Sequence, residues 1–191
     1  MKIIKLSNLC NGTAPEIEII SDSAIQRTGK PFFIPDFAGK FSYTPVLAVH
    51  ICRLGKNIAA KFANRYYDEI GLSLSFVAVD LLEQLKKECK PLSLATSFDS
   101  AVISGDLFSK GDLGEVADVC LQVDGVEIFN KELQSVYDMI DDAVEYVSRY
   151  FTLKIGDCLL FDFKAGEYEP AIGSHITAFI NGNKSVAIKV K

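Results

Sequence analysis

The chain lacks three features that would place it in a class at once: a long apolar run, a cluster of basic residues and a Cys-x-x-Cys pair. No apolar run approaches the roughly 18 residues that a membrane-spanning helix needs, so we expect no membrane partner. The net charge of -5, without clustered Lys or Arg, argues against nucleic acid. The five cysteines are odd in number and widely spaced, which argues against zinc or a disulfide framework and favours reduced, mostly buried thiols.

Common catalytic motifs are missing as well. The sequence has no Walker loop, no Gly-x-Gly-x-x-Gly, no His-Glu-x-x-His and no Gly-x-Ser-x-Gly. Of the two histidines, His50 lies in an apolar segment, where a core or edge histidine is expected more often than a ligand, and His175 reads as a surface residue. Residues 1–6 carry too short an apolar stretch for a signal peptide, so they predict a first strand and a cytoplasmic protein.

The composition is that of an ordinary globular protein, and the middle of the chain carries clear patterns of strands and helices. Residues 46–52 form an apolar run that predicts a buried strand. Apolar residues recur every four positions over 58–70, which predicts an amphipathic helix. The apolar run 72–79 leads into Asp80, which suits an N-cap, and the helix that follows has to end before Pro91.

The second half is rich in predicted strands. Asp124-Gly125 and Asn181-Gly182 each separate two apolar segments and predict hairpins. Residues 136–147 carry the apolar face of a helix, preceded by a capping-box-like Ser135. Residues 158–161 form one more strand. We therefore expect a strand-dominated α+β fold with three short helices, in a single domain over 1–191.

Several segments, taken in their order and spacing, resemble the fumarylacetoacetate hydrolase family, particularly its short bacterial members. The resemblance runs from about Pro15 to the C-terminus and rests on collinear segments rather than on one motif. The segments are residues 29–37, 51–58, 65–69, 138–140, 146–148 and 151–157.

The resemblance implies a mixed β-roll-like fold, usually homodimeric, that binds Mg²⁺ or Mn²⁺ and cleaves or isomerises small β-diketo or oxo-acids. In that family, carboxylates hold the cation, which neutralises charge that develops on oxo and enolate oxygens. A His-Glu pair near the N-terminus activates water, and a Lys helps to hold the anion.

The family's three metal-ligand positions are substituted in this chain. The Glu-x-Glu pair falls on Thr44 and Val46, and the third ligand, an Asp, falls on Ser75. These neutral side chains supply neither the charge nor the ligand strength that a hard divalent cation needs. We therefore expect no metal ligand, no catalytic residue and no cofactor.

Other positions of the family's active site have changed too. Its Lys falls on Thr96, with Asp99 retained nearby, and its substrate loop falls on 162–165, which contains Asp162 and Lys164. Asp80 is retained and is expected to cap its helix, while Asp99 is expected to keep a turn hydrogen bond. Residues 1–28 are shortened relative to the family, and the stretch with the His-Glu pair is deleted.

These losses predict a pseudoenzyme that acts by binding, as a homodimer or as the partner of an intact relative. The alternative is a metal-dependent hydrolase, decarboxylase or isomerase of acylpyruvate-like or other small oxo-acids, with a rebuilt site. The substituted ligands favour the first interpretation, and the intact scaffold favours the second.

Overall fold

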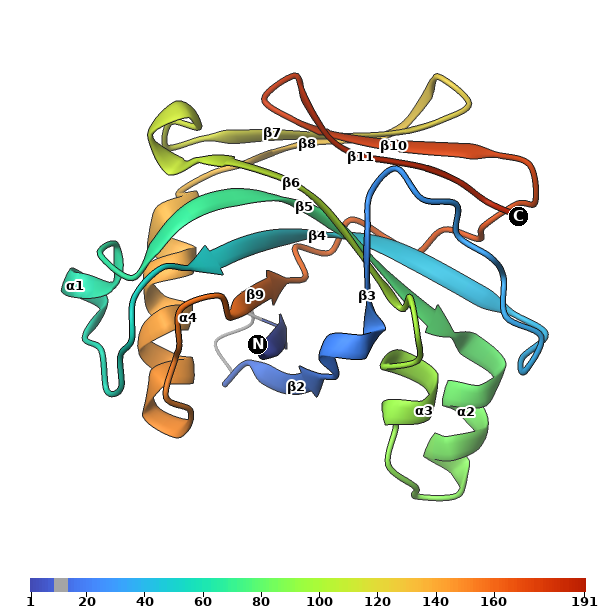
Figure 1. The fold of residues 1–191 in the computed structure, drawn as a ribbon, viewed down its shortest axis with the longest axis horizontal. Helices are drawn as coiled ribbons and strands as arrows, with labels where there is room; N and C mark the ends of the chain where they lie inside the picture. The colour runs from blue at the N-terminus through green and yellow to red at the C-terminus, as the bar shows by residue number, and fades with distance from the viewer. Residues whose placement is uncertain (9–13) are drawn as a thin grey trace.

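The computed structural model describes residues 1–8 and 14–191, which form two β-sheets with helices at their edges (Figure 1). The seven-stranded sheet contains β1 (Ile3–Ser7), β2 (Glu16–Ile20), β3 (Ile25–Arg27), β4 (Phe41–Ile51), β5 (Tyr67–Ala78), β6 (Val102–Ser109) and β9 (Cys158–Phe161). The four-stranded sheet contains β7 (Ala117–Val123), β8 (Val126–Leu133), β10 (His175–Ile180) and β11 (Asn183–Lys189). The helices are α1 (Ala60–Ala63), α2 (Val79–Lys87), α3 (Ser93–Thr96), α4 (Val136–Tyr150), and the 3₁₀-helices η1 (Asp22–Ala24) and η2 (Lys110–Asp112).

The large sheet is mixed and rolled. Its strand order is β2-β1-β9-β4-β5-β6-β3, in which the β1–β9 and β3–β6 pairs are parallel. In Figure 1, β1, β2 and β9 curl beneath the long antiparallel pair of β4 and β5, which we call the β4–β5 ribbon. This strand-dominated mixed roll confirms the predicted α+β fold.

The main core lies between the two sheets and α4. Leu47 and Leu72 of the ribbon, Val119 and Ile176 of the small sheet, and Val144 of α4 are all fully buried in one apolar cluster. Each buried aliphatic side chain of this size stabilises the fold by about 2 kcal/mol. The ribbon is therefore fixed on one face by apolar packing.

The opposite face of the ribbon lines the inside of the roll, because side chains alternate along a strand. Val46, Val102 and Leu160 are buried there in a second, smaller apolar cluster. Ser73 and Ser75 are buried on the same ribbon. The roll therefore encloses polar as well as apolar groups, and this is where chemistry can be placed.

A buried serine joins the two sheets. Ser185 of β11 accepts a hydrogen bond from the N–H of Leu72 (2.9 Å) and donates one to the carbonyl of Asp106 (2.7 Å). Gly105 is required beside it, since a Cβ there would lie 2.3 Å from the carbonyl oxygen of Leu72 and 2.5 Å from Ser185 Oγ.

The predicted turns are confirmed. Asp124 and Gly125 both have positive φ, as do Asn181 and Gly182, so both tight turns adopt the backbone that the sequence favours. The strand at 158–161 is also confirmed.

The helices are confirmed only in part. α4 forms where predicted, but Ser135 has a positive φ and makes no side-chain cap hydrogen bond, so the capping box is absent. The predicted helix at 58–70 is wrong, because α1 is a single turn and residues from Tyr67 onward pair with β4. The described residues hold four α-helices rather than three.

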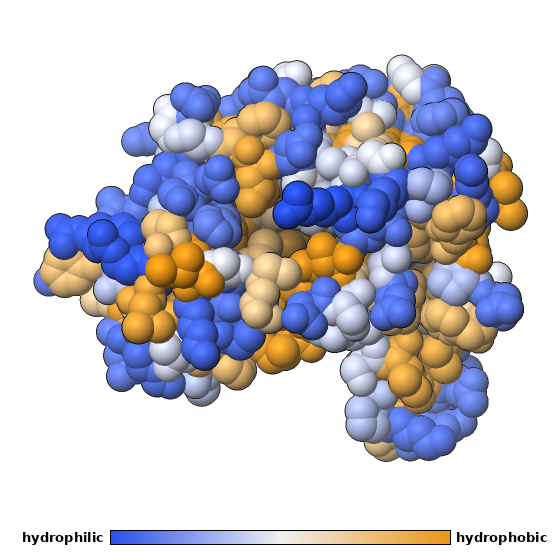
Figure 2. Space-filling model, viewed as in Figure 1, coloured by the Kyte–Doolittle hydropathy of each residue, from blue (hydrophilic) through white to orange (hydrophobic). Residues whose placement is uncertain are grey.

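Figure 2 shows hydrophilic residues over much of one face, with hydrophobic residues around the hollow near its centre. Within residues 1–8 and 14–191, no helix has the length and apolarity needed to cross a bilayer. The four described cysteines are free, but Cys52, Cys120 and Cys158 are half-buried and Cys89 is exposed, so the predicted burial is wrong. Cys10 lies outside the described residues.

Candidate active site inside the rolled sheet

The three substituted positions lie together on the β4–β5 ribbon. Thr44 is the direct partner of Ser75, and Val46 follows on the same face of β4. Ser75 is 2% exposed and Val46 is fully buried, while Thr44 is half-buried. Pro45 is tolerated between them because β9 pairs with β4 only from Leu47 onward, so no second ladder needs its missing N–H.

A lysine from the first strand reaches this position. Lys5 Nζ of β1 donates a hydrogen bond to Ser75 Oγ (2.9 Å), and the lysine is half-buried. β1 lies three strands from β5 in the sheet order, about 14 Å away if the sheet were flat. The contact therefore exists because the sheet is rolled and places β1 across from β5.

A carboxylate stands beside this lysine. Glu18 of β2 is the direct cross-strand partner of Lys5, so both side chains project from the same face of the hairpin. Thr96 Oγ1 of α3 donates a hydrogen bond to Glu18 Oε1. We call Lys5, Glu18, Ser75 and Thr96 the polar row. It brings an ammonium and a carboxylate to two of the positions singled out from the sequence.

A pocket of about 430 Å³ opens beside the row. Glu18 and Thr96 line it together with Ser7 of β1 and the start of α3 around Pro91 and Ser93. A volume of this size suits a small molecule. A ligand in this pocket, between β2 and α3, can therefore reach the carboxylate of Glu18.

The position of β1, and with it Lys5, depends on a buried ion pair. Asp157 is 1% exposed and accepts hydrogen bonds from the N–H of Lys2 (2.7 Å), from Lys2 Nζ and from the N–H of Lys154 (2.8 Å). Burial acts to raise the pKa of Asp157, but the Lys2 ammonium and the two N–H donors hold this pKa below its usual value. The ionised carboxylate thus fixes the start of β1 beside β9.

The two retained aspartates do not have the roles we predicted. Asp80 lies inside α2, whose N-cap is Ala78, and its Oδ2 accepts a hydrogen bond from the N–H of Gly39 (2.8 Å), which holds the pKa of Asp80 below its ordinary value. It therefore joins two segments rather than capping its helix. Asp99 is exposed, and within residues 1–8 and 14–191 its carboxylate makes no hydrogen bond, so the predicted turn bond is wrong.

Residues 162–165, which we predicted to replace the family's substrate loop, form a tight turn. Asp162 Oδ1 accepts a hydrogen bond from the N–H of Lys164 (2.8 Å), and Lys164 has a positive φ. Asp162 also donates its own N–H to the carbonyl of Leu6 (3.0 Å), which places the turn at the end of β1. The predicted deletion of the His-Glu stretch falls partly on residues 9–13, outside the described residues.

The residues at the family's ligand positions do not fit a divalent cation. Thr44, Val46 and Ser75 offer no carboxylate, and the Lys5 ammonium already donates to Ser75 Oγ. A positive charge there would repel a metal ion rather than help to hold it. We therefore derive no chemical step through a metal at this end of the ribbon.

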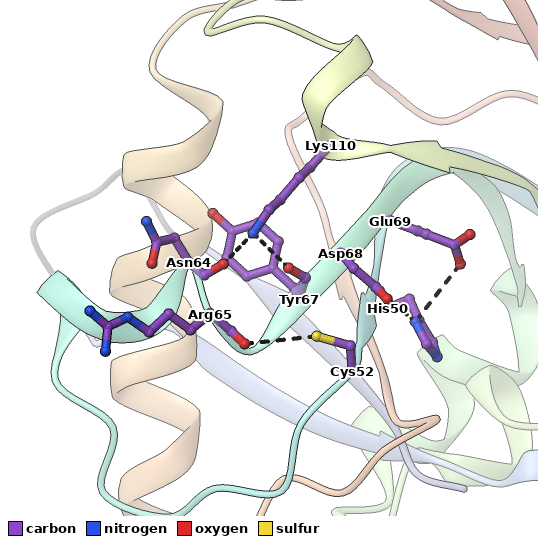
Figure 3. Close-up of polar contacts among 8 residues, drawn as sticks. All are labelled: His50, Cys52, Asn64, Arg65, Tyr67, Asp68, Glu69 and Lys110. Carbon is purple, nitrogen blue, oxygen red and sulfur yellow. Dashed lines mark hydrogen bonds and ion pairs between the residues drawn. The ribbon is translucent and has the colours of Figure 1, made fainter.

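A second set of polar groups lies at the other end of the ribbon (Figure 3). His50 Nδ1 lies 2.8 Å from Asp68 Oδ1 and 3.8 Å from Glu69 Oε2. We call these three residues the His50 cluster; one ligand atom from each lies within 4.8 Å of the others. His50 was expected to be a core or edge histidine; it is a half-buried residue of the central strand β4, paired with Cys158 of β9 on one side and Glu69 of β5 on the other.

Lys5 and Glu18 were not predicted as site residues, although the sequence carries a signal for both. Lys5 interrupts an apolar run at a position that alternates with Ile4 and Leu6, and Glu18 alternates with Ile17 and Ile19. In a half-buried strand, such positions face one side together. Which strand they face could not be read from the sequence, because that depends on the roll.

Comparisons with known proteins agree with the rolled fold. The chain is 26% identical over 179 residues to the mouse protein "Oxaloacetate tautomerase FAHD1, mitochondrial", covering 93% of this chain and 81% of the relative. It is 25% identical to the Escherichia coli "Oxaloacetate tautomerase YcgM", covering 88% and 78%. The crystal structure of fumarylpyruvate hydrolase from Pseudomonas aeruginosa with Mn²⁺ and pyruvate has a TM-score of 0.86 at 18% identity, covering 100% of this chain and 89% of that one.

Our prediction that no cofactor is involved is contradicted. The Pseudomonas aeruginosa structure is a complex with Mn²⁺, and the His50 cluster offers a possible site for a cation in this chain. The prediction considered only the substituted family positions, whereas the carboxylates lie elsewhere on the ribbon.

The match to a family model covers most of the sequence. The model described as "Fumarylacetoacetate (FAA) hydrolase C-terminal" matches residues 10–181. These residues include both ends of the ribbon, the polar row except Lys5, and three of the four strands of the small sheet. The chain belongs to the fumarylacetoacetate hydrolase family.

Proposed function

We propose that the protein is an enzyme that interconverts the keto and enol forms of a small oxo-acid. The observation that carries the proposal is the polar row, where the Lys5 ammonium and the Glu18 carboxylate project from one face of the β1–β2 hairpin. The names of the mouse and Escherichia coli relatives, both oxaloacetate tautomerases, support the choice of reaction.

The chemistry needs only a proton transfer and a stabilised anion. The Glu18 carboxylate takes a proton from the carbon next to the oxo group, and the electron pair of that C–H bond forms the enolate. The Lys5 ammonium stabilises the enolate oxygen, and the proton returns to that oxygen, so no atom or electron is gained or lost. Thr96 orients Glu18, and Ser75 holds Lys5 Nζ.

The test is the rate at which purified protein converts enol-oxaloacetate to its keto form, followed by the ultraviolet absorbance of the enol. We expect wild-type protein to exceed the buffer rate, and Glu18→Gln to lose about 1,000-fold of that excess, as for removal of a general base. Glu132→Gln, an exposed carboxylate on β8, is the control and should match wild type.

Two outcomes of this experiment would contradict the proposal. If wild-type protein does not exceed the buffer rate, the proposal fails. If Glu18→Gln and Glu132→Gln are equally active, the chemistry takes place elsewhere and Glu18 is not the base. Circular dichroism of both variants checks that each is folded.

A second candidate is a non-catalytic protein that binds an oxo-acid or a partner chain. The observation in its favour is that neutral side chains stand at Thr44, Val46 and Ser75, where the family resemblance places three ligand carboxylates. In this form the protein would act in the cytoplasm as a homodimer, or as the partner of an intact relative, with no catalytic residue.

Turnover and mass separate the two candidates. Light scattering after size exclusion gives the mass of the particle, and a dimer without tautomerase activity that still binds pyruvate would favour the second candidate. A monomer that accelerates the reaction would contradict it.

A further inference from the structure

We propose that the His50 cluster is a binding site for one divalent transition-metal ion, distinct from the polar row. The inference is independent of the tautomerase proposal, because it concerns the opposite end of the β4–β5 ribbon. Thr44 and His50 lie on the same face of β4, six residues apart, which corresponds to about 20 Å along an extended strand.

A β-bulge builds the cluster. His50 pairs with Glu69, while Ile51 pairs with Tyr67, so Asp68 is an extra residue on β5. In a regular strand, consecutive side chains point to opposite faces, but a bulge places two residues against one on the partner strand. Asp68 and Glu69 therefore both approach the single imidazole of His50, as Figure 3 shows.

The distances fit a metal ion with little adjustment. Protein ligands bind first-row divalent ions at about 2.1 Å, which separates neighbouring ligand atoms by about 3.0 Å in octahedral and about 3.4 Å in tetrahedral geometry. The observed separations from His50 Nδ1, 2.8 Å and 3.8 Å, bracket both values. Small side-chain rotations can therefore bring all three atoms onto one ion.

The charge balance also favours a cation. Among the described residues, no lysine or arginine forms an ion pair with Asp68 or Glu69. The nearby Lys110 Nζ instead donates to the backbone carbonyls of Asn64 and Tyr67, as Figure 3 shows. Two carboxylates thus share one imidazole, and a divalent ion would neutralise them.

The ligand set selects the class of metal. One imidazole nitrogen with two carboxylate oxygens suits Mn²⁺ or Zn²⁺, whereas Mg²⁺ prefers oxygen ligands alone and gives up its water reluctantly. His50 is 29% exposed and both acids are 49% exposed, so remaining coordination positions would face solvent. Glu69 also lines a groove of about 550 Å³ with Arg27 and Asp106, which gives an anionic co-ligand room to bind.

The experiment uses the fact that the chain has only two histidines. Mn²⁺ is titrated into wild-type protein while the imidazole proton signals are recorded by NMR. We expect paramagnetic broadening of the His50 signals at low Mn²⁺ and none of the His175 signals, because His175 has one carboxylate neighbour, Asp124, at 3.6 Å. Equal broadening of both histidines, or none, would overturn the proposal.

Titration calorimetry with Zn²⁺ measures the stoichiometry and the affinity of the site. Wild-type protein should bind one equivalent, and His50→Gln and Asp68→Asn should each weaken binding at least about 10-fold. His175→Gln is the matched control and should bind as wild type does. Unchanged binding by His50→Gln contradicts the site. If that variant fails to fold, the wild-type NMR titration still decides.

Discussion

The two ends of the β4–β5 ribbon have opposite chemical character. At the end of Thr44 and Ser75, neutral side chains meet an ammonium, Lys5, that comes from another strand. At the end of His50, two carboxylates meet an imidazole through a bulge. The same pair of strands therefore provides a setting for an anion at one end and for a cation at the other.

This difference teaches that one pair of strands can carry different charges at its two ends while a single apolar cluster holds it in place. Replacing buried carboxylates by Thr, Val and Ser removes groups that are costly to bury without a cation. The apolar cluster between the sheets does not depend on these positions, since it packs the other face of the ribbon. The packing between the sheets is therefore compatible with neutral side chains at Thr44, Val46 and Ser75.

The largest expected effect concerns the anchor of the Lys5 end. Asp157→Asn removes the charge that Lys2 contacts and should lower the free energy of unfolding by about 3 kcal/mol. For a chain of this length, that corresponds to a fall in Tm of about 9 °C, measured by calorimetry. An unchanged Tm would mean that the ion pair does not hold β1 in place.

The same carboxylate gives a pH dependence with a defined sign. The pKa of Asp157 is lowered in the folded protein, so its contribution to stability is present above the unfolded-state pKa of about 3.9 and is lost as pH falls toward the folded-state pKa. Unfolding by urea at pH 7 and pH 3 should show a smaller loss with acid for Asp157→Asn than for wild type. Equal losses would contradict this assignment.

A second change tests the charge of the polar row. Lys5→Met should lower the oxo-acid tautomerase rate by about 100-fold, as for removal of one group that stabilises an enolate, while Lys5→Arg keeps the charge and should retain more activity. The readout is the rate of loss of the enol absorbance. Equal rates for the two variants would show that the charge of Lys5 is not used.

A third change places a carboxylate at Ser75, where the family resemblance implies an aspartate. Ser75→Asp would place a carboxylate beside the Lys5 ammonium, pair with it and compete with the substrate anion, so the rate should fall by about 10-fold. Ser75→Ala is the control, since it removes the hydroxyl without adding charge and should cost less. A higher rate for Ser75→Asp would show that the lost carboxylate is still useful.

The smallest expected effect is at Asp99. Its side chain is exposed, so Asp99→Asn should change the free energy of unfolding by less than about 0.5 kcal/mol and leave the rate unchanged. A large effect on the rate would mean that the retained aspartate still takes part in the site.

Much of the fold could be predicted where local chemistry decides the structure. Asp124-Gly125 and Asn181-Gly182 tolerate positive φ, and the turns follow. The helical spacing at 58–70 was misleading, because pairing with the whole length of β4 outweighs a weak local preference. Of the apolar residues in that segment, Ile70 is buried in β5, whereas Phe62 lies on the single turn of α1 and is 43% exposed.

The site could be predicted only as far as the resemblance reached. The family resemblance pointed to Thr44, Val46, Ser75 and Thr96. It did not point to Lys5, which contacts Ser75 only because the rolled sheet brings distant strands together. The His50 cluster depends on Asp68 being the extra residue of a bulge, and nothing in the sequence around it marks that register. Contacts set by sheet curvature and register cannot be read from local patterns.

We propose that the two ends of the ribbon bind different ligands, and one series of backbone amide NMR spectra distinguishes them. Addition of pyruvate should shift the amide signals of Ser75 and Thr96 and leave those of Asp68 and Glu69 in place, whereas Mn²⁺ should broaden Asp68 and Glu69 first. The claim is contradicted if Mn²⁺ broadens Ser75 before Asp68, or if pyruvate leaves Ser75 and Thr96 unchanged.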